Sequence, residues 1–133
     1  MSAHAKILIV DDEEVVRKSY QRALNTEHCT VTAASNGGEA LQLMGDQSFD
    51  VVLLDQRMPG MDGMTLLKVI KANWPRSEVI MITGYPAVES AKQAVKLGAY
   101  DYLAKPVGPD EVIAAANIAL QHQHWALQER QVE

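Results

Sequence analysis

The sequence predicts an α/β fold: a single (βα)5 unit whose five parallel strands form one doubly wound sheet in the order 2-1-3-4-5. Three short apolar runs are continuous rather than alternating, as in strands buried on both faces of a parallel sheet. Segments with helical spacing of their apolar residues fill the intervals between the strands. This repeated alternation implies right-handed crossovers, with helices covering both faces of the sheet.

The five predicted strands differ in how completely we expect them to be buried. The continuous apolar runs are residues 7–10, 51–54 and 79–82, which we place in the centre. Residues 29–33 alternate apolar and polar positions and residues 102–104 form a very short run, so both suit sheet edges. This order changes direction between the first and third strands, where open α/β sheets bind ligands.

Capping residues indicate where several of the predicted helices begin and end. Asn36 and Glu39 resemble a capping box before the second helix. Asp62 is the expected N-cap of the third helix. Pro86 opens the fourth helix and Gly98 closes it, which is the usual asymmetry of proline and glycine.

Length and composition exclude several classes of protein. A chain of 133 residues fits one domain core, and 47% hydrophobic with 22% charged residues is typical of a globular protein. The net charge of -5 argues against direct contact with nucleic acid, and no apolar run approaches the roughly 20 residues of a membrane span. The single cysteine, Cys29, excludes a disulfide scaffold, so we expect a cytoplasmic protein.

Reactive side chains follow the predicted strands at their carboxyl ends. Asp11 and Asp12 follow the first strand, Asp55 the third, Thr83 the fourth and Lys105 the fifth. In the predicted order these ends share one edge of the sheet, and the acids flank the change in strand order. Close carboxylates repel each other by roughly 4 kcal/mol per pair at an effective dielectric of about 20. A magnesium ion would offset this repulsion, because hard cations prefer oxygen ligands.

The same group of side chains suits phosphoryl chemistry. A carboxylate beside a divalent ion, an ammonium and a hydroxyl can attack a phosphoryl group and form an acyl phosphate. Each residue taken singly has a plainer interpretation: Asp12 as a helix cap, Asp55 as a turn residue, Lys105 as a solvated amine and Thr83 as the end of a strand. Their combination at one edge favours a site.

Four short segments carry a resemblance to a known family. They are Ile-Val-Asp-Asp-Glu at 9–13, Leu-Asp-Gln-Arg-Met-Pro-Gly-Met-Asp-Gly at 54–63, Thr-Gly at 83–84 and Tyr-Leu-Ala-Lys-Pro at 102–106. In order and spacing, over about residues 6–120, the chain resembles a receiver domain of two-component response regulators, the family of the chemotaxis receiver. The resemblance implies a flavodoxin-like fold, and this family is itself a standard example of the 2-1-3-4-5 order.

The resemblance implies roles for the residues at the strand ends. Asp55 would accept a phosphoryl group from a phosphohistidine of a sensor histidine kinase or phosphotransfer protein. Magnesium would be held by Asp12, Asp55 and the backbone carbonyl of Arg57, with Asp11 acting through water. Lys105 would pair with Asp55 or its phosphate. The resemblance also implies a cis Lys105–Pro106 peptide bond, which is usual in this family.

The resemblance also implies a signalling switch and not a turnover enzyme. Thr83 and Tyr102 would form the switch, which shifts the surface of the fourth helix, fifth strand and fifth helix to control an output domain or partner protein. One rim position, Arg57, is individual to this chain, since family members vary two residues after the phosphoryl acceptor. The Arg57 guanidinium lies over the acidic pocket or faces solvent, and we favour solvent. Tyr85 is expected to affect how water reaches an acyl phosphate.

Two other functions match the motifs less well. A phosphohydrolase of the dehalogenase-like type would resemble a pattern with a second aspartate two residues after the nucleophile, where this chain has Arg57. A flavodoxin-like cofactor-binding protein would need phosphate-binding groups after the first strand, where residues 11–14 are all acidic. A receiver that no longer takes phosphate would lack Asp55 or Lys105, and both are present.

The end of the chain has two interpretations. We assign residues 1–121 to the receiver domain and residues 122–133 to a helical extension or linker. From Glu111 to Glu133 there is neither glycine nor proline, and an apolar stripe continues as far as Leu127, with Trp125 beside it. The extension either meets a partner helix, as in a homodimer, or leads to an output domain, or it frays as chain ends commonly do.

Overall fold

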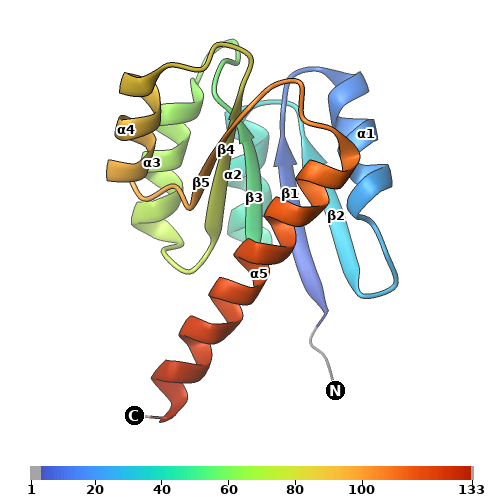
Figure 1. Cartoon of the computed structure of the whole chain (residues 1–133), viewed down its shortest axis with the longest axis vertical. Coiled ribbons are helices and arrows are strands. Elements are labelled where there is room, and N and C mark those ends of the chain that lie inside the picture. The colour runs from blue at the N-terminus through green and yellow to red at the C-terminus, as the bar shows by residue number, and fades with distance from the viewer. Residues whose placement is uncertain (1–3, 133) are drawn as a thin grey trace.

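The computed structural model describes residues 4–132, and describes side chains for residues 4–123. Ten elements alternate along the chain, as Figure 1 shows: β1 (Ala5–Val10), α1 (Glu14–Leu24), β2 (Cys29–Ala34), α2 (Gly37–Asp46), β3 (Val51–Asp55), α3 (Gly63–Asn73), β4 (Glu78–Thr83), α4 (Val88–Lys96), β5 (Asp101–Ala104) and α5 (Pro109–Val132).

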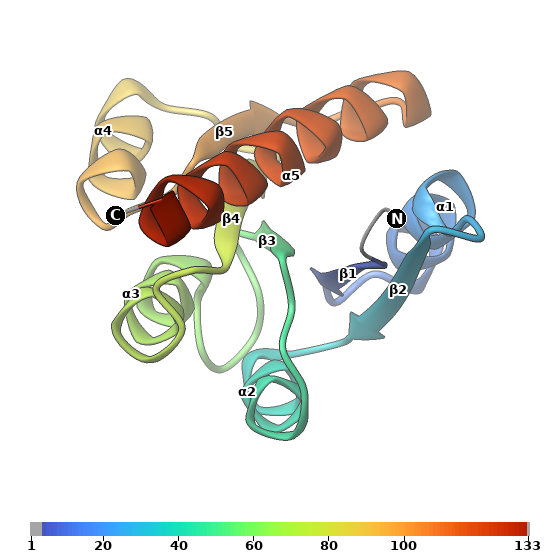
Figure 2. The ribbon, with the colours of Figure 1, turned by 90° about the horizontal axis from the view of Figure 1, so that it is seen from below.

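The five strands form one parallel sheet in the order β2-β1-β3-β4-β5, which confirms the predicted topology. The sheet lies between two helical layers. Helices α1 and α5 cover one face, and α2, α3 and α4 pack against the other (Figure 2). Because all strands are parallel, their carboxyl ends share one edge, which is at the top in Figure 1.

The burial of the strands explains their sequence patterns. Every residue of β3 is buried, whereas β2 and β5 at the sheet edges are partly exposed. Along β1, Leu8 and Val10 pack toward α2 and α3, while Ile7 and Ile9 pack toward α1 and α5. Both alternating sets are therefore apolar, as the continuous runs predicted.

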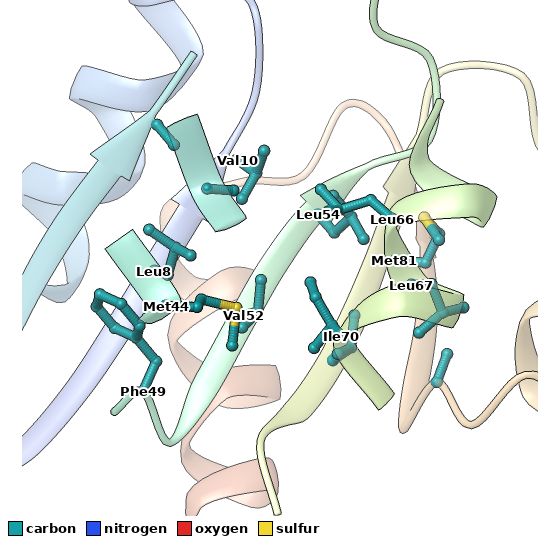
Figure 3. Packing of buried hydrophobic residues seen from close by; sticks show 14 of the residues in the cluster. Leu8, Val10, Met44, Phe49, Val52, Leu54, Leu66, Leu67, Ile70 and Met81 are labelled. Carbon is teal, nitrogen blue, oxygen red and sulfur yellow. The ribbon is translucent and has the colours of Figure 1, made fainter. Parts of the chain in front are cut away.

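The core beneath α2 and α3 fixes how these helices lie on the sheet. In Figure 3, Leu54 of β3 and Met81 of β4 lie beside the side chains of α3, and Leu8 of β1 lies beside Met44 of α2. The α3 side chains of Leu66, Leu67 and Ile70 are fully buried. Burial of one such side chain stabilises the fold by about 1.5–3 kcal/mol. This packing holds the start of α3, and with it the loop that follows β3, against the sheet.

The predicted caps are present, with two differences. Asp62 accepts a hydrogen bond from the Thr65 N–H at 2.9 Å, and Asn36 accepts one from the Glu39 N–H at 2.8 Å. The Glu39 carboxylate, however, accepts from the Ser35 N–H and not from that of Asn36, so the capping box is displaced by one residue. Helix α4 begins at Val88, after Pro86, because its N-cap Ala87 is extended.

Asp12 does not cap α1. The N-cap is Glu13, which makes no side-chain capping bond, and the Asp11 carboxylate accepts the Glu13 N–H at 2.9 Å. The side chain of Asp12 is exposed at the carboxyl edge of the sheet. The capping interpretation of Asp12 is therefore wrong, and its carboxylate lies with those of the site.

Gly63 allows α3 to begin close to the end of β3. A Cβ atom at this position would lie 2.5 Å from the carbonyl oxygen of Asp55 and 2.6 Å from the Cα of Gln56. Its N–H donates to the Gln56 carbonyl at 2.8 Å. Any larger residue would push the loop away from Asp55, so this glycine fixes the backbone that follows the site.

Helix α5 crosses the predicted boundary at residue 121 without interruption (Figure 1). The side chain of His122 contacts Glu78 at the start of β4, and that of Gln123 contacts Asp50 just before β3. Trp125 and Leu127 lie beyond the residues whose side chains are described, so the predicted apolar stripe is not tested there. Within residues 4–132, no helix combines the length and apolar character needed to cross a bilayer.

Candidate functional site

Three carboxylates meet at the carboxyl edge of the sheet. One oxygen each of Asp11, Asp12 and Asp55 lies within 4.8 Å of the others. The pairing of β1 with β3 aligns Val10 with Leu54, so the residues that follow are neighbours. Asp11 and Asp55 are only 2% and 6% exposed, whereas Asp12 faces solvent. The sequence-predicted acids are thus brought together, with an open side at Asp12.

Lys105 supplies the positive charge of the site. Its Nζ lies 3.1 Å from Asp11 Oδ2, 3.4 Å from Asp55 Oδ1 and 3.7 Å from Glu13 Oε1. The side chain reaches these acids from β5 by passing Gly84, where an added Cβ would just touch its Cδ at 4.0 Å. Lys105 is therefore nearer to Asp11 than to Asp55. Glu13 is not among the predicted site residues; its signal in the sequence is its place directly after Asp12.

The surroundings of Asp55 favour its protonated form more than water does. Burial raises the pKa of Asp55 to about 6, assisted by the negative charge of Asp11 and opposed by Lys105 and the Arg57 backbone N–H. Burial by itself lowers the pKa of Lys105. The hydrogen bond and charge of Asp11, followed by Asp55, outweigh burial, so the pKa of Lys105 lies above its usual value. At neutral pH the pocket thus carries ionised Asp55 beside an ammonium.

The donor set of the pocket fits a magnesium ion. It offers carboxylate oxygens within reach of one another, and the exposed Asp12 leaves a side on which bound water fits. One ammonium against three carboxylates leaves excess negative charge that a divalent cation would neutralise. The residues present therefore match the magnesium ion that the family resemblance implied.

Thr83 and Tyr102 occupy different surroundings near the acids. Thr83 is completely buried, and its Oγ1 accepts the Tyr85 N–H at 3.0 Å. Tyr102 is half-buried, and its hydroxyl donates to Gln56 Oε1 at 3.0 Å. Gln56 is not among the predicted site residues. The available signal was its position, directly after Asp55, with a long side chain that carries a hydrogen-bond acceptor.

Arg57 lies on Tyr85. The centre of its guanidinium is 4.2 Å from the centroid of the Tyr85 ring, and both side chains are exposed. The prediction of a solvent-facing guanidinium is therefore incomplete, because one face rests on an aromatic ring. The negative face of the ring attracts the guanidinium, so this contact holds Arg57 in a way that a fully solvated arginine would lack. The Lys105–Pro106 peptide bond is cis, as the family resemblance implied.

Comparisons with known proteins agree with this geometry. The model of the response regulator receiver domain matches residues 7–117. The chain is similar to the DNA-binding transcriptional regulator NtrC of Escherichia coli K12, with 39% identity over 96% of the chain and 27% of that protein. It is 43% identical to the regulatory protein AtoC of the same strain, over 92% of the chain and 27% of that protein.

A solved structure shows the same arrangement of elements. The CheY-like receiver domain protein from Methanospirillum hungatei JF-1 superposes with a TM-score of 0.88 and 31% identity, over 94% of this chain and 99% of that one. This chain spans about a quarter of the length of the curated regulators that it matches.

Proposed function

Because this chain belongs to the receiver domain family of two-component response regulators, we propose that Asp55 is the residue that accepts the phosphoryl group. The family is a signalling switch with a phosphorylatable acidic cluster. The observation that supports Asp55 is its position at the end of the central strand β3, buried, with Lys105 Nζ at 3.4 Å. Asp12 is exposed, and Asp11 is the closer partner of Lys105.

The proposed reaction needs an ionised carboxylate and a stabilised phosphoryl group. With a pKa of about 6, Asp55 is ionised at neutral pH and attacks phosphorus. An oxygen–phosphorus bond forms, the bond from phosphorus to the donor nitrogen breaks, and its electron pair returns to the donor imidazole. Magnesium, when bound by Asp12, Asp55 and the Arg57 carbonyl with Asp11 through water, supplies positive charge for the phosphoryl oxygens. Lys105 supplies the second charge.

We propose that Thr83 and Tyr102 pass the phosphorylated state to the surface formed by α4, β5 and α5. A Thr83 hydroxyl that turns toward a phosphoryl oxygen must release the Tyr85 N–H, which it now accepts. The loop before α4 then loses a constraint, and the equilibrium between two packings shifts. The chain undergoes one phosphorylation in each signalling cycle and does not act as a turnover enzyme.

The proposed partners are a sensor histidine kinase or phosphotransfer protein and an output domain or effector. An output domain agrees with the names of the longer relatives, which are transcriptional regulators. We propose that residues 122–133 form an extension toward it, or a helix that pairs in a homodimer. Because bacterial DNA lies in the cytoplasm, these relatives also support a cytoplasmic location.

Acetyl phosphate with magnesium tests the acceptor. The wild-type chain should gain the mass of one phosphoryl group, and hydroxylamine should remove it. Asp55→Asn should abolish the gain, because an amide is a poor nucleophile. Asp62→Asn is the matched control: it removes a carboxylate from the same loop, and asparagine caps a helix as well as aspartate does. An equal mass gain in Asp55→Asn would disprove the assignment.

Thr83→Ala tests the switch separately. This variant keeps the three acids and Lys105, so it should still accept phosphate. Amide chemical shifts of α4 should respond to phosphorylation in the wild-type chain and respond much less in the variant. A normal response of α4 in Thr83→Ala would contradict the proposed coupling.

A further inference from the structure

The backbone of Gln56 has a fixed position relative to the proposed phosphoryl acceptor. It directly follows Asp55, its N–H donates to the Ile82 carbonyl at 3.0 Å, and its carbonyl accepts the Gly63 N–H at 2.8 Å. The backbone is thus tied to β4 on one side and to the start of α3 on the other. The Cα from which the Gln56 side chain extends is therefore held directly beside Asp55.

The amide oxygen of Gln56 accepts the hydroxyl of Tyr102, with 3.0 Å between the two oxygens. The ring of Tyr102 is half-buried and packs against the core that β4 shares with α3 and α4. Its backbone is paired with Met81 of β4. A phenol that turns inward needs an acceptor, because an unpaired buried hydroxyl costs about 1–3 kcal/mol. Gln56 supplies that acceptor.

We propose that Gln56 is a positioning residue of the switch: its amide oxygen holds the Tyr102 hydroxyl and stabilises the inward orientation of the ring before any phosphorylation. A ring turned toward solvent would lose this partner, because the Gln56 backbone is tied to β4 and α3. The inference rests on the proposed function for the role of Tyr102. It adds a second link between Asp55 and β5 that does not pass through Thr83.

The geometry has a direct consequence for signalling. Gln56 and Asp55 share a peptide bond, so a displacement of the end of β3 on phosphorylation moves the acceptor of the Tyr102 hydroxyl as well. The bond also favours one packing of β5 and α4 in the unphosphorylated chain. Removal of this hydrogen bond should therefore change the difference in β5 and α4 packing between the unphosphorylated and phosphorylated chain. The acidic pocket should stay unchanged.

Side-chain rotamers of residue 102 test the proposal in the unphosphorylated chain. Three-bond couplings at residue 102 give the ratio of inward to outward χ1 rotamers. Gln56→Met keeps the length of the side chain and removes the acceptor, and it should lower this ratio about three- to tenfold, as expected for one hydrogen bond. Gln56→Glu keeps an acceptor oxygen and should retain the wild-type ratio.

Tyr102→Phe removes the same bond from its other end. The rotamer ratio at residue 102 should fall by a similar factor in this variant, and adding Gln56→Met should lower it no further, because the two changes share one interaction. An unchanged ratio in both Gln56→Met and Tyr102→Phe would overturn the proposal. If Gln56→Met does not fold, Tyr102→Phe alone decides the question.

Phosphorylation serves as a separate measurement. Gln56→Met should still gain the mass of one phosphoryl group from acetyl phosphate, because the acidic pocket is unchanged. A wild-type chain that gains no mass would defeat the proposed function. The rotamer ratios, which are measured without a phosphodonor, would still decide whether Gln56 holds Tyr102.

Discussion

The acids at the amino edge of the sheet, where the strands begin, differ in their partners from the acids at the carboxyl edge, where the strands end. At the amino edge, Glu78 at the start of β4 lies 2.6 Å from the Nδ1 of His122 and 3.7 Å from the Nζ of Lys71. Asp50, just before β3, accepts the Lys6 N–H at 2.8 Å and the Gln123 side-chain amide at 3.1 Å. Each of these two acids therefore has a partner from more than one element.

At the carboxyl edge the charges are not balanced in this way. Among the described residues, the ammonium of Lys105 is the one that contacts both Asp11 and Asp55, and it also reaches Glu13. Asp12 adds a third carboxylate within 4.8 Å of the first two. The fold thus places excess negative charge, partly buried, where strands β1 and β3 end.

This difference separates stabilising charges from reactive ones. The acids at the amino edge fasten α5 to the sheet, because their partners include two residues of that helix. The acids at the carboxyl edge repel one another and raise the free energy of the unliganded fold. Binding of a cation recovers part of that cost, which makes the edge suited to magnesium and to phosphoryl transfer.

Removal of the Asp55 charge should give the largest change. The pKa of Asp55 is about 6 in the folded chain, above the roughly 3.9 of an unfolded aspartate. The folded state therefore holds this proton more tightly, and wild-type stability falls as the pH rises from about 4 to about 6. Without divalent ions at pH 7, Asp55→Asn should raise the free energy of unfolding by about 1–3 kcal/mol.

Urea unfolding at several pH values measures this effect. The gain of Asp55→Asn over the wild-type chain should shrink toward zero near pH 4, where Asp55 is protonated in the folded state and half protonated in the unfolded state. At the opposite edge Asp50→Asn should give no gain at pH 7, because its carboxylate has two donors. A gain for Asp55→Asn that does not vary with pH would show that ionisation of the buried Asp55 carboxyl is not its cause.

Magnesium affinity should distinguish the acids within the pocket. Asp12→Ala should weaken binding at least about tenfold, or about 1.4 kcal/mol, because it removes a ligand oxygen. Glu13→Ala should change affinity much less, since Glu13 contacts Lys105 from the exposed rim. Calorimetric titration gives both values, and the reverse order would mean that the metal lies elsewhere.

The amino edge should show a smaller loss of stability. His122→Ala removes the hydrogen bond with Glu78 and should lower the free energy of unfolding by about 0.5–1 kcal/mol, as expected for one partly exposed hydrogen bond. Gln121→Ala, at the exposed neighbouring position, is the control and should have little effect. If both variants match the wild-type chain, the amino edge does not stabilise α5.

The end of the chain should contribute least. A chain that ends at Gln123 keeps the contacts to Glu78 and Asp50, so its free energy of unfolding should match that of residues 1–133 within about 0.5 kcal/mol. Light scattering gives the molar mass of both chains. A dimer that becomes a monomer on truncation would assign the extension to association, whereas a clear loss of stability would place the domain boundary beyond residue 123.

Local sequence determined the elements and most of the site. Continuous apolar runs identify β1, β3 and β4 because a central parallel strand buries both faces, and the weaker runs of β2 and β5 fall at the edges for the converse reason. Once the strands are parallel, Asp11, Asp55 and Lys105 must share an edge, because each lies at the carboxyl end of a strand or directly after it. No side-chain detail was needed for that conclusion.

Tertiary structure decided which side chains touch. Gln56 and Tyr102 are 46 residues apart, and Glu78 and His122 are 44 apart, so no periodicity links them. Local sequence likewise does not show that Lys105 lies closer to Asp11 than to the predicted partner Asp55. The rotamer of a long side chain depends on the residues packed around it, and these residues come from distant segments of the sequence. The strand ends were therefore predictable from local pattern, whereas each contact among them required the packed fold.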